Sequence, residues 1–260
     1  MYGAIIGDLA GSIYEYEQTR EIHEIQVARI IEENAFFSDD SILTIAIADA
    51  IENGGQYDKY LREYIQKYAD YHPNIKPYFK NPFSPGTMKW AYQAEVGKSM
   101  GNGAMMRISP VGYLFNTEEE VIKNATLATI PSHNTEEAID AAKKIALIIF
   151  YLRKGIPLNE IYKKLEIKLS FKPFEHFNST CHETIDNCLY VLLQSTSFED
   201  AIKKIIACGG DTDTNACIVG SMAEAKYGIP EYLIEEANKK IPKEFIKVLT
   251  KAKNRNGSKI

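Results

Sequence analysis

No two cysteines in this sequence have the Cys-x-x-Cys spacing, so a zinc ribbon and a thioredoxin-type redox motif are excluded. We instead expect reduced, mostly buried thiols in a cytoplasmic protein. The cysteines are Cys181, Cys188, Cys208 and Cys217. Long apolar runs are also missing: the longest, 145–152, is too short to span a membrane. Because Asp8 interrupts the first apolar segment, no signal peptide is expected either.

Positive charge is scarce, since the sequence has 30 lysines and arginines against 35 aspartates and glutamates, for a formal net charge of −5. A general nucleic-acid-binding surface needs concentrated positive charge, so we expect no nucleic-acid partner. The 260 residues contain no linker and no repeat of fixed period. The sequence therefore predicts one domain, residues 1–260, in a monomer.

Strict alternation of apolar and polar residues, which is typical of half-buried strands, is absent as well. Nearly all periodic segments have helical spacing and are joined by short polar loops, which predicts a compact all-α fold. Residues 1–16 have helical spacing, and further helices are expected over 41–52, 57–71, 86–94, 117–128, 135–152, 158–165, 181–194, 198–208, 216–227, 231–240 and 243–253.

Small residues recur at a regular step in the first segment. Gly3, Gly7 and Gly11 are four apart, so a helix would place them where another backbone can pack closely. Asp8 and Glu15 are seven apart and would fall roughly on one face. Taken alone, each residue has a favoured structural interpretation: Asp8 ties down a neighbouring loop, and Glu15 is a solvated helix end.

Paired carboxylates precede the helix expected at 216–227. Gly209 and Gly210 lead into Asp211 and Asp213, and threonine hydroxyls follow each of these aspartates. Carboxylate and hydroxyl oxygens at a helix entrance suit a hard cation such as Mg²⁺, Mn²⁺ or Ca²⁺. The alternative is that one aspartate is only an N-cap, which explains neither the second carboxylate nor the paired glycines.

A second acidic motif, Ser38-Asp39-Asp40, precedes the helix expected at 41–52. Ser38 would be a natural N-cap, and the helix dipole favours the two carboxylates in the first turn, so capping explains this motif too. The two motifs nevertheless have one pattern, a hydroxyl and two carboxylates at the start of an apolar helix. They lie about 170 residues apart, so a common site would require both ends of the chain in one domain.

A glycine-rich turn, 97–107, precedes a further helix-like stretch. Glycines there would expose backbone N–H groups, which is typical of an anion site at a helix start. The residue order is not that of a P-loop, and no strand precedes the turn, so a dinucleotide fingerprint is excluded. His133 lies just before the next long helix, a position where a histidine is more often structural than catalytic.

Five motifs in one order resemble the ADP-ribosylglycohydrolase family, in particular its dinitrogenase-reductase-activating type. They are Ile6–Glu15, Ser38–Asp40, Gly101–Arg107, Ser132-His133 and Gly209–Thr214. The resemblance extends from Met1 to about Pro230. It implies a compact all-α fold around a centre of two divalent cations, Mg²⁺ or Mn²⁺. By motif position it implies the metal ligands Ser38, Asp39, Asp40, Asp211, Asp213 and Thr214.

One position departs from the family pattern, because threonine is usual where this chain has Ser38. Serine keeps the hydroxyl oxygen but lacks the methyl group that restricts the side-chain rotamer. We expect metal binding to be retained and weakened.

The resemblance also implies a reaction, hydrolysis of the bond between C1″ of ADP-ribose and a protein side chain, through an oxocarbenium-like transition state. Glu15 is assigned to acid–base work or to gating the site, and Asp39 or Asp40 could instead orient the water. Ser99 and the 101–103 turn would cradle the diphosphate, and His133 would lie near the distal ribose. The residues assigned to substrate binding are Ser99, Gly101, Asn102, Gly103, His133, Gly209 and Gly210.

Three functions remain open. The first is removal of ADP-ribose from arginine or serine of a protein, or from a small ADP-ribose derivative. The second is a non-catalytic binder of ADP-ribose or a related nucleotide, which ranks lower because all six oxygen ligand positions are present. The third is an enzyme of the same fold that acts on another ribose-linked metabolite, since a fold does not determine its substrate.

Overall fold

The computed structural model describes residues 1–15, 25–73, 81–172 and 174–255. α-Helices are the only extended regular elements in these ranges, apart from isolated bridges between Lys98 and His133 and between Gly101 and Thr180. The predicted all-α fold is confirmed. The helices are α1 (Tyr2–Gly11), α2 (Asp39–Glu52), α3 (Tyr57–Lys67), α4 (Pro85–Ala91), α5 (Gly103–Met106), α6 (Ser109–Leu114), α7 (Glu118–Thr129), α8 (Glu136–Arg153), α9 (Leu158–Lys164), α10 (Cys181–Gln194), α11 (Phe198–Ala207), α12 (Thr212–Tyr227), α13 (Glu231–Lys240) and α14 (Lys243–Arg255).

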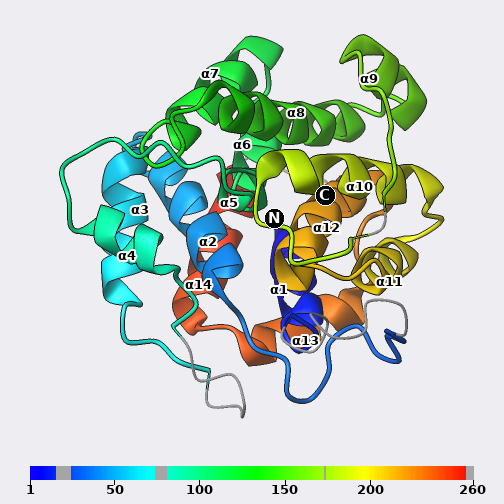
Figure 1. Ribbon diagram of the computed structural model, residues 1–260, viewed down its shortest axis with the longest axis horizontal. Helices are drawn as coiled ribbons and strands as arrows, with labels where there is room; N and C mark the ends of the chain where they lie inside the picture. The colour runs from blue at the N-terminus through cyan, green and yellow to red at the C-terminus, as the bar shows by residue number, and fades with distance from the viewer. Residues whose placement is uncertain (16–24, 74–80, 173, 256–260) are drawn as a thin grey trace.

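Helices α1 and α12 lie side by side at the centre of the molecule (Figure 1). The glycines of α1 allow this approach. A Cβ on Gly3, Gly7 or Gly11 would lie 2.1, 2.0 or 2.3 Å from a backbone oxygen of α12, closer than any real Cβ contact. The predicted close backbone packing is thus confirmed, and the partner is the helix that begins at the second acidic motif.

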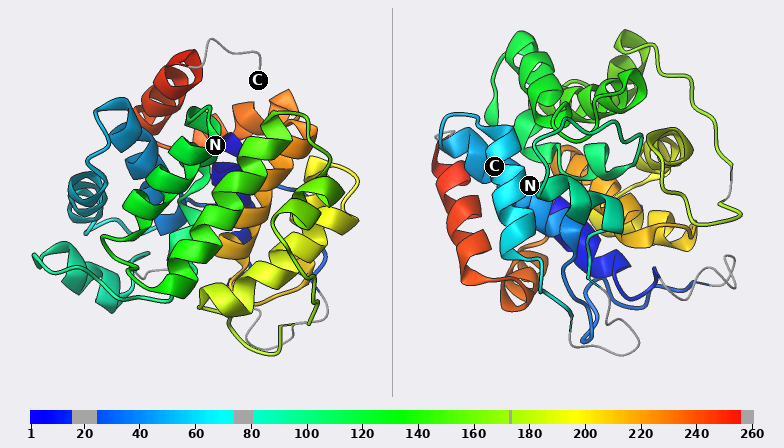
Figure 2. Two further views of the ribbon diagram at one scale, coloured as in Figure 1. Left: turned by 90° about the horizontal axis from the view of Figure 1, so that it is seen from above. Right: turned by 60° about the vertical axis from the view of Figure 1, so that its left-hand side comes forward.

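The other helices surround this pair in groups. Helices α2, α3 and α14 pack together on one side, and α6, α7 and α8 form a layer at the top of Figure 1. Helices α10 and α11 pack against α12 on the opposite side, and α13 contacts α1. The two views of Figure 2 show the same central position of the first helix. In the described ranges, no helix has both the length and the apolar character needed to cross a membrane.

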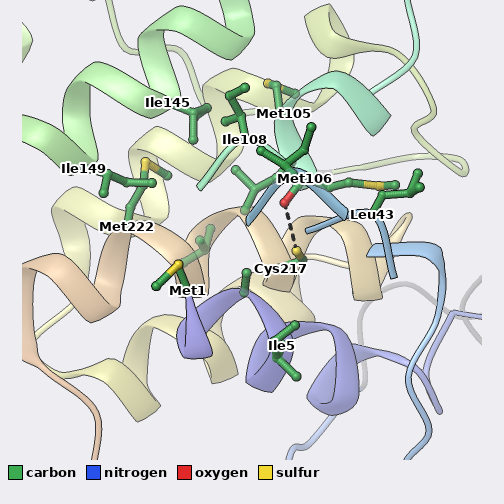
Figure 3. Packing of buried hydrophobic residues seen from close by; sticks show 14 of the residues in the cluster. Met1, Ile5, Leu43, Met105, Met106, Ile108, Ile145, Ile149, Cys217 and Met222 are labelled. Atoms are coloured by element: carbon green, nitrogen blue, oxygen red, sulfur yellow. Dashed lines mark hydrogen bonds between the residues drawn. The ribbon is translucent and has the colours of Figure 1, made fainter. Parts of the chain in front are cut away.

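Buried apolar side chains from both ends of the chain form one core cluster. Figure 3 shows Ile5 of α1 and Met222 of α12 in this cluster, together with Ile149 of α8. The thiol of Cys217 donates to the backbone oxygen of Met106 at 3.3 Å, which ties α12 to α5. All four cysteines are free and three are buried, as the sequence predicted.

Three predicted helix boundaries were wrong by four residues or more. Helix α1 ends at Gly11 and not near Tyr16, which lies outside the described residues, because Ser12 and Tyr14 turn the chain. Helix α3 ends at Lys67, since Tyr71 leaves it to donate its hydroxyl to the backbone oxygen of Phe37 at 3.0 Å. Helix α12 begins at Thr212, four residues before the predicted start. The short helix α6 was not predicted.

Candidate functional site

The start of α2 is held by hydrogen bonds from the first acidic motif. Ser38 is the N-cap, and its Oγ accepts a hydrogen bond from the backbone N–H of Asp40 at 3.3 Å. The Ser38 hydroxyl donates to Oδ1 of Asp8 at 2.8 Å, and its oxygen lies 3.0 Å from Oδ2 of Asp40. The predicted capping role of Ser38 is therefore confirmed, and the same hydroxyl oxygen adjoins two buried carboxylates.

Asp8 of α1 fastens the start of α2. Its carboxylate accepts hydrogen bonds from the backbone N–H groups of Ser38 at 2.9 Å and Ser41 at 3.1 Å, and from both of their hydroxyls. The interpretation of Asp8 as a group that ties down a neighbouring loop is confirmed. Burial raises the pKa of Asp8 to about 6, although these hydrogen bonds favour its charged form.

The second acidic motif lies at the start of α12, and N-capping does not explain its carboxylates. Asp211 occupies the N-cap position, but its side chain makes no capping hydrogen bond. One of its oxygens instead accepts from Nδ2 of Asn102 at 2.7 Å. Three residues on, the Thr214 hydroxyl donates to Oδ2 of Asp40 at 3.3 Å. The starts of α2 and α12, separated by about 170 residues, thus meet at one place.

Two overlapping trios of carboxylates result from this meeting. Oxygen atoms of Asp8, Asp40 and Asp213 lie within 4.8 Å of one another, and so do those of Glu15, Asp211 and Asp213. The spacing of Asp8 and Glu15 suggested that they lie on one helical face, but the two carboxylates belong to different trios. Glu15 lies in the turns after α1 and joins the second trio, whereas Asp8 joins the first.

The trios are electrostatically unfavourable without a cation. Burial and the neighbouring carboxylates raise the pKa of Asp39 to about 7, and burial raises that of Asp211 to about 7. The pKa values of Asp40 and Asp213 lie well above the ordinary value for the same two reasons. In addition, Oδ1 of Asp40 is buried with no hydrogen-bond partner in the described structure. Clustered oxygen donors with an unpartnered atom fit a hard divalent cation such as Mg²⁺ or Mn²⁺.

A cleft of about 870 Å³ adjoins this acidic cluster. Its acidic wall includes Glu15, Asp39, Asp211 and Asp213, together with Thr214. Asp40 and Ser38 are buried next to these residues, at 1 % and 5 % exposure. The lining also includes the 97–103 segment with Ser132 and His133. The cleft has the size of a small-molecule site.

Two backbone N–H groups of the glycine-rich turn make hydrogen bonds within the protein, whereas the sequence suggested that such groups would be exposed to an anion. The N–H of Gly101 donates to Oγ of Ser99 at 3.0 Å, and the N–H of Asn102 donates to the backbone oxygen of Ser179 at 2.9 Å. The side-chain amide of Asn102 is directed to Asp211. Ser99, Gly101, Asn102 and Gly103 all line the cleft, so the turn contributes to its shape while two of its N–H groups are already bonded.

Gly209 and Gly210 are absent from the described lining of the cleft, although the sequence assigned them to substrate binding. Both have positive φ, 79° and 74°. A Cβ on Gly210 would lie 2.0 Å from Oδ1 of Asn178. These glycines turn the chain into α12 and leave room for the Asn178 side chain.

Asn178 is the main residue of the candidate site that sequence reasoning missed. It is 1 % exposed, and its Oδ1 accepts from the backbone N–H of Asp211 at 2.9 Å. Its Nδ2 lies 2.7 Å from Oγ1 of Thr184 and 2.9 Å from Oδ1 of Asn215, donating to both. Asn178 stands in an irregular segment without periodicity, so only the fold reveals that it positions the second acidic motif.

His133 is buried on the cleft wall, and Arg107 lies beside it. Nη2 of Arg107 donates to Oγ of Ser132 at 2.6 Å, and that Oγ lies 2.7 Å from Nδ1 of His133. Burial, with the nearby charge of Arg107, holds the pKa of His133 well below its ordinary value, so its imidazole is neutral at pH 7.

Comparisons with known proteins agree with one another. A family model described as ADP-ribosylglycohydrolase matches residues 1–257. A protein of Acanthamoeba polyphaga mimivirus named "Putative ADP-ribosyl glycohydrolase L543" is 24% identical over 283 residues, which cover 86% of this chain and 84% of that protein. A solved structure described as "ADP-ribosylglycohydrolase-related protein complex" has a TM-score of 0.76 and 16% identity, covering 98% of this chain and 95% of the other. At that identity the likeness shows the fold alone.

Proposed function

The chain belongs to the ADP-ribosylglycohydrolase family, and from that premise we propose that it is a metal-dependent hydrolase that removes ADP-ribose from arginine or serine side chains of proteins. Membership supports glycohydrolase activity on ADP-ribose derivatives. The metal requirement and the protein acceptor are the parts that we add.

One observation carries the proposal: the two acidic helix starts meet beside a cleft of nucleotide size. Asp211 and Asp213 from α12, with Asp39 from α2, line this cleft. Burying several carboxylates together is costly unless a cation or protons neutralise them. Such an arrangement is expected when the carboxylates have a chemical task, because a structural cap needs one of them at each helix.

The proposed ligands of two divalent cations are Ser38, Asp39, Asp40, Asp211, Asp213 and Thr214. When bound, the cations would hold ribose hydroxyls and lower the pKa of a water molecule. Asp8 is left out of this set even though it belongs to the first trio. Its oxygens already accept four hydrogen bonds from Ser38 and Ser41, so it supports the start of α2.

Glu15 is the proposed proton-transfer residue. It lines the cleft, and one of its oxygens lies within 4.8 Å of oxygens of Asp211 and Asp213. Loss of a leaving group from C1″ is assisted by a carboxylic acid that protonates it or by a carboxylate that takes a proton from water. Asp39 also lines the cleft and is suited to orient that water.

The test is hydrolysis of arginine-linked and serine-linked ADP-ribosyl peptides, each with Mg²⁺, Mn²⁺ or EDTA. We expect metal-dependent release of ADP-ribose from one peptide. Glu15→Gln keeps the size of the side chain but removes its acid–base function, so the rate should fall by about 10²- to 10⁴-fold. Asp213→Ala should abolish release.

Binding of ADP-ribose to Glu15→Gln, measured by calorimetry, is the control. Unchanged binding with a lost rate supports a proton-transfer role, whereas full activity of Glu15→Gln would exclude it. No release from either peptide, with ADP-ribose still bound, would favour a small ADP-ribose derivative as substrate or a non-catalytic binder.

A further inference from the structure

Arg107 is an unusual buried cation. It is the C-cap residue of α5, is 2 % exposed, and has an Nε atom without a hydrogen-bond partner in the described structure. Burial lowers the pKa of its guanidinium to about 10, so it stays charged at neutral pH. Its Nη2 donates to the Ser132 hydroxyl at 2.6 Å. One nitrogen of the guanidinium thus contacts the Ser132-His133 pair.

Two groups approach the same ring nitrogen of His133. Oγ of Ser132 lies 2.7 Å from Nδ1, and Nη2 of Arg107 lies 3.5 Å from it. Arginine has donors only. If Nδ1 carried a hydrogen, that hydrogen would point towards the positively charged guanidinium. If Nδ1 is unprotonated, the Ser132 hydroxyl accepts from Arg107 and donates to the Nδ1 lone pair, so that each contact joins a donor to an acceptor.

The other ring nitrogen, Nε2, lies beside the glycine-rich turn. It is 3.5 Å from the position that a Cβ would take on Gly101 and equally far from that position on Gly103. His133 and both glycines line the cleft. The absence of side chains at these two positions leaves Nε2 open towards the cleft.

We propose that Arg107 and Ser132 fix His133 in its Nε2–H tautomer, so that the imidazole is a constant hydrogen-bond donor to a ligand oxygen in the cleft. In this arrangement Arg107 and Ser132 are positioning residues that act through His133. The identity of the oxygen, on a phosphate or a ribose of ADP-ribose, rests on the proposed function. The assignment of the tautomer does not rest on the proposed function, because the contacts that fix it are present in the protein without a ligand.

The consequence is a division of tasks within the cleft. Under the proposed function, Glu15 and the aspartates handle protons and cations. His133 cannot act as a base through Nδ1, which is engaged by Ser132. Its Nε2–H donates a hydrogen bond to a ligand oxygen. If the proton moved to the other ring nitrogen, Nε2 would become an acceptor and this hydrogen bond would be lost.

The experiment is long-range ¹H–¹⁵N NMR of the full chain labelled at histidine nitrogens, at pH 7 and without ligand. The sequence has five histidines, and the signals that vanish in His133→Gln belong to His133. We expect Nδ1 at the shift of an unprotonated nitrogen and Nε2 at that of a protonated one. An Nδ1–H pattern, an average of the two tautomers, or a doubly protonated ring would overturn the proposal.

Variants of Ser132 test the positioning role. Ser132→Ala should move the two nitrogen shifts towards an average and weaken ADP-ribose binding by about two- to tenfold, and Ser132→Thr should restore both. Ser109→Ala is the matched control, since Ser109 is fully buried with an unpartnered hydroxyl on α6. Wild-type shifts in Ser132→Ala would overturn the role of Ser132. The expected shifts in a protein that does not bind ADP-ribose would support the tautomer and count against the proposed function.

Discussion

Gly7 of α1 lies directly against Ala216 of α12, so that a Cβ on Gly7 would be 2.0 Å from the Ala216 backbone oxygen. This contact links the fold to the candidate site. Asp8 follows Gly7 in the chain, and Asp213 lies three residues before Ala216 on α12. The close approach of the two backbones therefore sets how near these carboxylates lie to each other.

Gly7→Ala should destabilise the protein strongly, because its methyl group would meet backbone atoms that cannot rotate away. We expect a loss of about 3 kcal/mol or more in the free energy of unfolding, at or above the upper end for overpacked cores. Urea unfolding measures it. Gly86→Ala is the matched control, since the nearest atom to its Cβ is a side-chain oxygen at 3.8 Å. Equal stability of the two variants would contradict the packing argument.

Asp213→Asn should have opposite effects with and without metal. In EDTA at pH 8 the variant should unfold at a temperature a few degrees higher, because it loses repulsion from Asp211 and Asp40, worth about 1–3 kcal/mol. With Mn²⁺ the wild type should gain about 2.7 kcal/mol at a concentration of 100 Kd, and the variant much less. Thermal unfolding by calorimetry in both buffers tests this. A variant less stable than the wild type in EDTA would argue against the repulsion.

Asn178→Ala should weaken both the fold and metal binding. It leaves the backbone N–H of Asp211 and the side chain of Asn215 without their buried partner, which costs about 2–4 kcal/mol. Asn187→Ala is the control. Asn187 is also buried, but its amide bonds the backbone of Lys172, so its loss should lower stability and leave Mn²⁺ affinity unchanged. Electron paramagnetic resonance of free Mn²⁺ gives the affinities. Equal affinities in both variants would remove Asn178 from the positioning of Asp211.

His133 should make the protein less stable as the pH falls. Its folded pKa lies well below 6.5, so below pH 6.5 the unfolded chain binds a proton that the folded chain does not. Stability is then lost by up to about 1.4 kcal/mol per pH unit. The difference in the free energy of unfolding between wild type and His133→Gln should decrease by about 1 kcal/mol from pH 7 to pH 5.5. Urea unfolding at several pH values measures it, with exposed His182→Gln as the control. Parallel profiles would contradict a buried neutral imidazole.

Much of the secondary structure was predictable because it depends on local interactions. Helix α10 and helix α13 begin and end where apolar periodicity and flanking residues place them. The helix expected from residue 117 begins there with a capping box of Thr117 and Glu120. Helical spacing, caps and glycine steps act within a few residues, so they can be recognised without knowledge of the fold.

The candidate site was only partly predictable, because its geometry depends on contacts between distant segments. The acidic residues were identified, but the sequence could not show that Asp8 would be enclosed by Ser38 and Ser41. Nor could it show that Gly210 makes room for Asn178. Irregular segments have no period, and their conformation is selected by the partners that they meet.

By itself, the sequence determined an all-α chain with two acidic helix starts and a glycine face on the first helix, since each of these follows from residue type and spacing. The tertiary structure alone decided that the two helix starts meet, that Glu15 leaves its helix to join Asp211 and Asp213, and that Arg107 and Ser132 contact His133. Those outcomes depend on packing between segments that are distant in the sequence, such as α1 and α12. Burial of apolar surface from both ends of the chain in one core brings together polar groups that local interactions would leave apart.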